Sequence, residues 1–202
     1  MVSYYHSTTK TRKEEILRKQ SVKFSAFDIN KYLNRLLQTV TIRDELEDIP
    51  VSYPGAPRLA PYMGNGLYCF DNYEEAESYQ STSTNEVVTV NMVEEFSKYD
   101  FDTPQVKLEI YNLLNNELQD FLQTRDDEDR LPWTAIIEFL KRSLYSDFTE
   151  KPEMVGILIH ILREISPRNK YDVYLKTFYV KIKSKDMRYI LIRNEKAILH
   201  ML

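Results

Sequence analysis

The chain has 202 residues, of which 43% are hydrophobic and 29% charged, and its formal net charge is −4. This length suits one domain of generous size, which buries roughly 70% of its unfolded surface and needs no disulfides or metals to fold. The one cysteine, Cys69, excludes an internal disulfide framework and favours a reducing compartment. The start lacks the apolar segment of a signal peptide, and no stretch approaches the roughly 20 apolar residues of a membrane span. We therefore expect a soluble, cytoplasmic protein with no membrane partner.

The charges are distributed unevenly along the chain. Residues 94–153 hold 15 acidic and 7 basic residues, a balance of −8, and the rest holds 16 acidic and 20 basic residues, a balance of +4. Two interpretations stay open: the middle helices have solvated acidic faces, or the protein has two surfaces with different partners.

The first part of the chain predicts a strand, two helices and a long loop. Residues 2–6 read as a strand that ends at a polar cluster, residues 10–20 as a short helix, and Asp28 as the N-cap of a second helix. Residues 48–66 contain four of the eight prolines and three of the four glycines. A loop so rich in turn residues is expected to form the wall of a site.

The segments that follow predict an aromatic strand, a capped helix and another strand. Residues 66–70 read as a buried strand, residues 71–75 as a capping box that opens a helix through Tyr79, and residues 86–92 as a strand.

A long helical block comes next. Three amphipathic helices are predicted, each opened by a proline, and residues 124–130 are predicted to be a charged connector. The prolines are Pro104, Pro132 and Pro152. Residues 171–181 and 189–193 read as closing strands.

Strands therefore stand on both sides of the helical block. They must pair across it, because an isolated two-stranded piece is only marginally stable. The order predicts an α+β fold, a single domain over residues 1–202 with a helical insertion at about 103–165, rather than alternating βαβ units.

Several kinds of site are excluded by missing motifs. The chain has no GxGxxG, Walker or GxSxG motif. Its histidines, His6, His160 and His200, lack metal-ligand spacing, and Cys69 has no cysteine partner. We expect neither a metal site nor a thiol enzyme.

One combination of residues suggests a site for a flat ring attached to a sugar. His6 ends the first strand, Gly66 opens the aromatic strand with Tyr68, and Tyr79 lies one helix later. Two tyrosines can sandwich a heteroaromatic ring at about 4.5–7 Å, histidine can bond ribose hydroxyls, and glycine permits close approach. Ordinary core packing of the tyrosines and a satisfied strand-end histidine remain open alternatives.

The segment GNGLYCFDNYEEAESY resembles the GxGxYF…A…Y stretch of the ADP-ribosyltransferase superfamily, and more narrowly the branch with diphtheria toxin and the poly(ADP-ribose) polymerases. That family opens with a strand ending in His-Gly-Ser/Thr, here His6-Ser7-Thr8, and its stacking tyrosines are 11 positions apart, as Tyr68 and Tyr79 are. The resemblance covers about residues 2–92 and the last strand, and it leaves residues 103–165 unexplained. It implies a split β-sheet core.

The resemblance also implies a function. It implies a mono-ADP-ribosyltransferase that moves ADP-ribose from NAD+, its co-substrate, to a macromolecular acceptor, nucleic acid or protein. In the family the histidine holds ribose hydroxyls, the residue after it offers its backbone to the nicotinamide amide, and the tyrosines stack on nicotinamide. Small bacterial members are often toxins of toxin–antitoxin or phage-defence systems, which implies an antitoxin or regulatory partner.

The sequence departs from the family pattern at three positions. Ser7 stands where glycine is preferred, although its backbone amide can still donate, and Ala76 stands where the polymerases carry a serine that touches the amide. The family also needs a carboxylate, usually Glu, at the start of its last conserved strand, to stabilise an oxocarbenium-like centre. In the aligned register Tyr189 takes that place, and Glu195 follows roughly 20 Å further along an extended strand.

The candidate site follows from these matches. The candidate catalytic residues are His6, Tyr68 and Glu195. The candidate NAD+-binding residues are His6, Ser7, Thr8, Gly66, Tyr68, Tyr79 and Tyr189. Asp172 and Asp186 are other carboxylates near strand starts. Two alternatives stay open: the same fold binding NAD+ or ADP-ribose without catalysis, or a helical adaptor whose residues 103–165 bind a partner.

Overall fold

The computed structural model describes residues 2–25, 62–79, 85–124, 126–148, 154–165, 170–180 and 183–202, and the chain divides into two compact units. The first unit combines Met1–Ala26, Asn65–Asp102 and Tyr171–Leu202, and the second combines Phe27–Gly64 and Thr103–Lys170. The helix predicted after Asp28 and most of the loop predicted at 48–66 lie outside the described residues.

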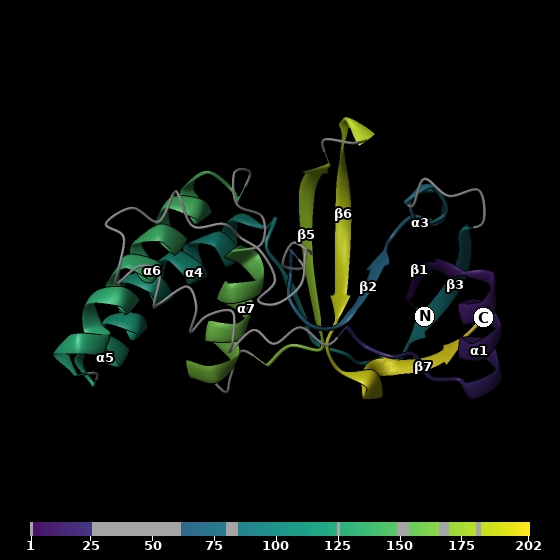
Figure 1. The fold of residues 1–202 in the computed structure, drawn as a ribbon, viewed down its shortest axis with the longest axis horizontal. Coiled ribbons are helices and arrows are strands. Elements are labelled where there is room, and N and C mark those ends of the chain that lie inside the picture. Colours follow the sequence, from purple (N-terminus) through teal and green to yellow (C-terminus); the bar gives the residue numbers. More distant parts are fainter. Residues whose placement is uncertain are drawn as a thin grey trace. The chain divides into compact units, whose positions relative to one another are not determined.

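The first unit is built around a seven-stranded sheet in the order β4-β5-β6-β2-β1-β3-β7 (Figure 1). Its elements in chain order are β1 (Ser3–Thr9), α1 (Lys10–Lys19), β2 (Leu67–Phe70), α3 (Tyr73–Ser78), β3 (Asn85–Met92), β4 (Lys98–Asp100), β5 (Val173–Val180), β6 (Lys185–Ile192), the 3-10 turn η4 (Glu195–Ala197) and β7 (Ile198–Met201). Among the strand pairs that the described residues form, β4–β5 is parallel and the others are antiparallel. The predicted α+β class is confirmed.

Strands from both ends of the chain pair across the helical block, as predicted: β3 pairs with the C-terminal strand β7. The sequence analysis did not predict β4 and β7, which are short edge strands. It also placed the start of β6 four residues too late, because that strand begins at Lys185. The first four residues of β6 mix Lys, Asp, Met and Arg, so they carry no clear apolar alternation.

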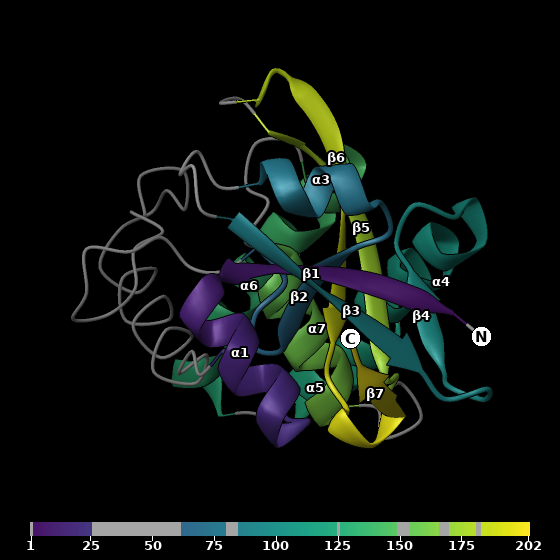
Figure 2. The same ribbon diagram turned by 90° about the vertical axis from the view of Figure 1, so that its right-hand side faces the viewer.

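The sheet is almost divided between β1 and β2. Every residue of β1 has a partner in β3, and every residue of β2 has one in β6, yet β1 and β2 share the single register pair Tyr5↔Phe70. Figure 2 shows how far the sheet twists between its halves, because β1 runs across the view whereas β5 and β6 run almost vertically. His6, the residue after Tyr5, therefore lies where the two halves separate.

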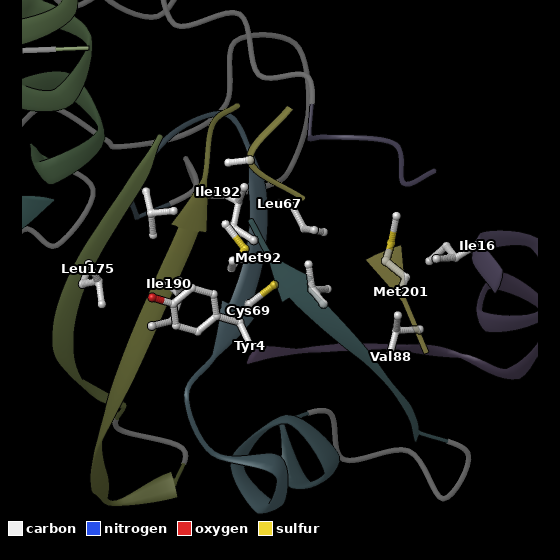
Figure 3. Packing of buried hydrophobic residues seen from close by; sticks show 13 residues of the cluster. Tyr4, Ile16, Leu67, Cys69, Val88, Met92, Leu175, Ile190, Ile192 and Met201 are labelled. Atoms are coloured by element: carbon white, nitrogen blue, oxygen red, sulfur yellow. The ribbon is translucent and has the colours of Figure 1, made fainter. Parts of the chain in front are cut away.

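The apolar core of the first unit lies on one face of the strands and is covered in part by α1 (Figure 3). Because side chains alternate along a strand, every second residue enters it, as Ile190 and Ile192 of β6 do. Each fully buried aliphatic side chain of this kind contributes about 1.5–3 kcal/mol. Cys69 is one of the core residues, and burial raises the pKa of its thiol, so it behaves as a small apolar side chain.

The end of α1 covers the outer edge of β7. The helix stops at Gln20, which adopts a left-handed conformation with φ of 49°. Its side-chain amide donates to the carbonyl oxygen of Met201 at 3.1 Å and accepts from the N–H of Met201 at 3.0 Å. These are the two bonds that a neighbouring strand would make, so an edge open to pairing with another chain is closed here.

The second unit contains four described helices rather than the three predicted. They are α4 (Pro104–Asn115), α5 (Glu117–Gln123), α6 (Asp127–Tyr145) and α7 (Met154–Ile165). The apolar stripe assigned to one helix is divided at Asn116, a residue type with low helix propensity. The predicted connector at 124–130 is also wrong, because α6 begins at Asp127. Pro132 lies inside α6, where its fixed φ is still helical.

Almost every described side chain of α7 is buried, and the two polar ones, His160 and Arg163, are partly exposed three positions apart, so the apolar surface of the predicted amphipathic helix is wide. Within the second unit, α7 packs closely against residues 62–64. The N–H of Gly156 donates to the carbonyl of Tyr62 at 2.9 Å, and a Cβ at this glycine would meet the backbone N of Gly64 at 2.7 Å. Glycine is thus required here by packing within the second unit.

Candidate functional site

His6 bonds the neighbouring half of the sheet through its side chain. Its Nδ1 lies 2.8 Å from the carbonyl oxygen of Tyr68. A carbonyl can only accept, so Nδ1 carries the proton, and in the neutral ring Nε2 keeps a lone pair. Burial lowers the pKa of His6, and the hydrogen bond to Tyr68 opposes this only in part. The imidazole is therefore neutral at neutral pH and can accept a hydrogen bond from a ligand hydroxyl.

Next to this contact five aromatic side chains form the aromatic cluster: Tyr68 and Phe70 of β2, Tyr79 after α3, Phe178 of β5 and Tyr189 of β6. The register explains how they meet. Phe70 lies opposite Tyr189, and residues two apart on a strand share a face. The face is the one opposite the apolar core, which takes the alternating residues Leu67 and Cys69.

Tyr189 is the centre of the aromatic cluster. Its ring centroid lies 6.4 Å from that of Tyr68 and 6.0 Å from that of Tyr79, with interplanar angles of 83° and 82°. Phe70 and Phe178 lie 5.4 and 5.7 Å from it. Tyr189 is 4% exposed, whereas Tyr79 is 38% exposed. The structure therefore brings three predicted site residues together, with the two tyrosines of the motif each in contact with the third.

Ser7 and Thr8, the residues after the histidine, are both buried. They pair with Val87 and Glu86 of β3, so their place is fixed by the sheet. The hydroxyl oxygen of Ser7 has no hydrogen-bond partner in the part of the chain that the structure describes.

Packing of the backbone requires a glycine at position 66. Its φ is +152°, and a Cβ would meet the carbonyl oxygen of Ile192 and the side chain of Leu191, both at 2.6 Å. Its N–H donates to the hydroxyl of Ser25 at 3.0 Å, and its carbonyl accepts from that hydroxyl at 2.8 Å. The glycine is needed for β2 to lie against β6, whether or not a ligand binds.

Glu195 is not part of the aromatic cluster. It is exposed in η4, beyond the end of β6, which itself runs about 10 Å from Tyr189 to Ile192. The residue before it, Asn194, caps the turn and donates to the carboxylate of Asp172 at 2.6 Å.

The two other candidate carboxylates also lie elsewhere. Asp172 accepts from the N–H and the hydroxyl of Ser97, each at 2.8 Å, and so joins the segment before β4 to the start of β5. Asp186 is exposed near the start of β6, opposite Tyr179.

Lys176 was missed by the sequence analysis. It lies opposite Tyr189 in the β5–β6 register and is 1% exposed. Its Nζ is 2.8 Å from Asp102 Oδ1 and 6.0 Å from the Phe178 ring centroid. The other Asp102 oxygen accepts from the N–H and hydroxyl of Thr177 at 2.9 and 2.7 Å. The sequence did contain a signal for this pair, namely a lysine inside an apolar strand. A charge that is buried in this way needs a partner of opposite charge.

Burial alone would raise the pKa of Asp102. Hydrogen bonds from Lys176 and Thr177, together with the lysine charge, outweigh it and hold that pKa below its usual 3.8. A charged pair therefore lies beside the aromatic cluster, on the face that carries Tyr189, and the charge of the aspartate balances that of the lysine.

Comparison with family models, with curated proteins and with solved structures found no match. In the described ranges no helix has both the length and the apolar character to cross a membrane. Within the same ranges, no group of three or more His, Cys, Asp and Glu side chains is placed to hold a metal ion.

Proposed function

We propose that this protein binds the nicotinamide end of NAD+ beside His6 and the aromatic cluster, and transfers ADP-ribose to a macromolecular acceptor, either nucleic acid or protein. The observation that carries the proposal is the hydrogen bond of the His6 imidazole to the backbone carbonyl of Tyr68, a residue whose ring belongs to the aromatic cluster. The motif resemblance supplies the identity of the ligand.

The chemistry of the cluster supports a ligand of this kind. The nicotinamide ring of NAD+ is flat and positively charged, and tyrosine faces attract cations by about 0.5–1 kcal/mol when exposed and more when desolvated. Tyr79 is partly exposed at the end of α3, so one aromatic member of the cluster is accessible from solvent. Nε2 of His6 can accept from a ribose hydroxyl while its other nitrogen is held by the backbone.

A second candidate function is binding of NAD+ or ADP-ribose without catalysis. It is favoured by a specific observation: Tyr189 occupies the place that the family gives to its carboxylate, and Glu195 lies outside the aromatic cluster. Without a preorganised negative charge, the oxocarbenium-like transition state would lose several kcal/mol of stabilisation.

Calorimetric titration of NAD+ tests the binding step. The double variant His6→Ala/Tyr68→Ala should bind at least tenfold more weakly than wild type, because a stacking face worth about 0.5–1.5 kcal/mol and a hydrogen bond worth a similar amount are both lost. Tyr179→Ala is the matched control, since this tyrosine is 57% exposed on β5 and outside the cluster. Equal affinity in wild type and the double variant would sink the proposal.

Incubation of the protein with NAD+ and cell extract tests the transfer step. ADP-ribose should be detected on one of protein, RNA or DNA, each assayed separately, and lost with the double variant. NAD+ binding with no transfer to any acceptor would instead support the non-catalytic candidate.

A further inference from the structure

The charged pair of Lys176 and Asp102 lies beside the candidate site. Lys176 is the direct partner of Tyr189 in the β5–β6 register, and residues opposite each other on neighbouring strands share a face of the sheet. Phe178, two residues later on β5, shares that face as well, and its ring centroid is 6.0 Å from the lysine Nζ. A full positive charge therefore lies next to two members of the aromatic cluster.

Burial makes this charge more effective than a charge on the surface. The lysine is 1% exposed, so water and salt screen it much less than they screen an exposed ion pair. Because its ammonium is closed off from solvent, it acts on a bound ligand through its electric field rather than by contact. Two unit charges about 10 Å apart change an affinity by a factor of about ten at an effective dielectric constant of about 20.

The carboxylate of Asp102 balances the lysine charge and is held in place by several hydrogen bonds. One oxygen accepts from Nζ of Lys176, and the other accepts from the N–H and the hydroxyl of Thr177. Burial alone would raise the pKa of Asp102, but these bonds and the lysine charge keep it below 3.8, so the carboxylate is ionised at neutral pH. The pair as a whole is neutral and does not oppose the attraction of the tyrosine faces for a cation.

We infer that the Lys176–Asp102 pair determines the preference of the candidate site for the charge of the bound ring: because the aspartate neutralises the lysine, the site favours the cationic ring of NAD+ over the uncharged ring of NADH. The inference rests on the proposed function and adds a specificity determinant to it. NAD+ and NADH have the same sugars and the same diphosphate, so the ratio of their affinities reports on the ring. Loss of the aspartate charge disfavours the cationic ring, and loss of the lysine charge favours it.

Calorimetric titrations of NAD+ and NADH at neutral pH test the inference, with affinities expressed per folded molecule. The ratio of the NAD+ affinity to the NADH affinity should fall about tenfold in Asp102→Asn and rise in Lys176→Met. In the double variant Asp102→Asn/Lys176→Met, which removes both charges, it should return to within about twofold of wild type. Thr177→Val is the matched control, because it removes a hydrogen bond of Asp102 and keeps both charges, so its ratio should equal that of wild type.

The ratio separates an electrostatic role of the pair from a structural one. Loss of a merely structural contact weakens both ligands together, so an unchanged ratio in the single variants overturns the inference alone. A shift in the same direction in both single variants overturns it too, because opposite charges must act in opposite directions. If Asp102→Asn yields too little folded protein, Lys176→Met and the double variant still decide the outcome. Failure of wild type to bind NAD+ overturns the proposed function first, and the inference with it.

Discussion

The imidazole of His6 on β1 and the backbone carbonyl of Tyr68 on β2 are joined by a 2.8 Å hydrogen bond at the place where the sheet divides. Tyr5↔Phe70 is the single register pair of these two strands. A side-chain hydrogen bond therefore joins β1 to β2 here, whereas backbone hydrogen bonds join the other neighbouring strands of the sheet. The burial of this imidazole, rather than the hydrogen bond, links the stability of the fold to its protonation state, because a protonated ring can still donate from Nδ1.

The first prediction is a pH dependence from His6. Its pKa is lowered below 6.5 in the folded protein and returns to about 6.5 on unfolding, so between these values the unfolded chain binds more protons. The stabilisation is fully present above about pH 6.5 and is lost as pH falls through the folded pKa. Thermal midpoints from about pH 5 to 8 should show a steeper acid-side decline in wild type than in His6→Gln. NAD+ affinity should decline in the same window, because protonation removes the Nε2 acceptor. Identical pH profiles of the two proteins would contradict this.

The second prediction concerns Asp102 and Lys176. Asp102→Asn should lower the free energy of unfolding by about 3 kcal/mol, because the ammonium of Lys176 stays buried after its carboxylate partner is removed. The lowered pKa of Asp102 means that its contribution is present above about pH 3.8 and is lost as pH falls below this value. Urea titrations at neutral pH and near pH 3 should therefore differ less in the variant than in wild type.

Glu15→Gln is the control for this measurement. Glu15 pairs with Lys19 on the exposed side of α1, at 2.7 Å, and exposed pairs of this spacing contribute little to stability because water screens both charges. A loss of similar size in Asp102→Asn and Glu15→Gln would show that burial of the lysine charge is not what makes the first pair important.

The sequence predicts local features of this fold, but it does not predict long-range contacts such as the pair of Asp102 and Lys176. The run of valines at 86–92 and the aromatic run at 66–70 identified strands, because a favourable composition within a short segment is a local property. The partner of Lys176 could not be predicted, since Asp102 is 74 positions away and meets it only through the β4–β5 pairing. The burial of the Ser7 hydroxyl without a hydrogen-bond partner among the residues that the structure describes is likewise a property of the fold.

The third prediction is that Gln20 protects the edge of β7. Gln20→Ala should destabilise the protein by about 1–2 kcal/mol, because both bonds to the backbone of Met201 are lost. The exposed strand edge should also increase self-association on heating, measured by light scattering. Lys19→Ala, one position earlier on the same helix, should change neither quantity noticeably. Unchanged stability in Gln20→Ala would mean that water replaces the amide without cost.

The fourth prediction separates packing from binding at Gly66. Gly66→Ala should destabilise the fold by at least about 2 kcal/mol, because its Cβ would meet the Ile192 carbonyl and the φ is unfavourable for other residues. If enough folded protein remains to titrate with NAD+, its affinity per folded molecule should stay near that of wild type. A stable variant with weakened NAD+ binding would show instead that this glycine contacts the ligand.

Only part of the candidate site could be predicted from the sequence. His6, Tyr68 and Tyr79 were selected because short motifs in a fixed order carry them, and in the structure the two tyrosines each contact Tyr189, while His6 bonds the backbone of Tyr68. The carboxylate could not be identified in this way, because a sequence register alone does not show where the chain turns after β6. The turn at Asn194 is fixed by its bond to Asp172, 22 positions earlier.

The last prediction compares Glu195 with Tyr189. Glu195 is exposed in η4, so Glu195→Gln should leave both the stability and the NAD+ affinity within about twofold of wild type. Tyr189→Phe should preserve the four ring contacts of the aromatic cluster and remove only the hydroxyl. If the hydroxyl contacts the ligand, this variant should bind NAD+ about fivefold more weakly while its thermal midpoint changes little.

Transfer of ADP-ribose by the same two variants decides between the proposed functions. In a transferase that uses Glu195, Glu195→Gln should cut the rate by orders of magnitude, since each factor of ten corresponds to 1.36 kcal/mol of transition-state stabilisation. Because Glu195 lies outside the aromatic cluster, we expect a transferase of this fold to keep full transfer in Glu195→Gln, and loss of transfer in Tyr189→Phe would indicate a site that works without the usual carboxylate. If both variants keep full activity, Asp186→Asn is the next to measure, because Asp186 is the remaining carboxylate of β6.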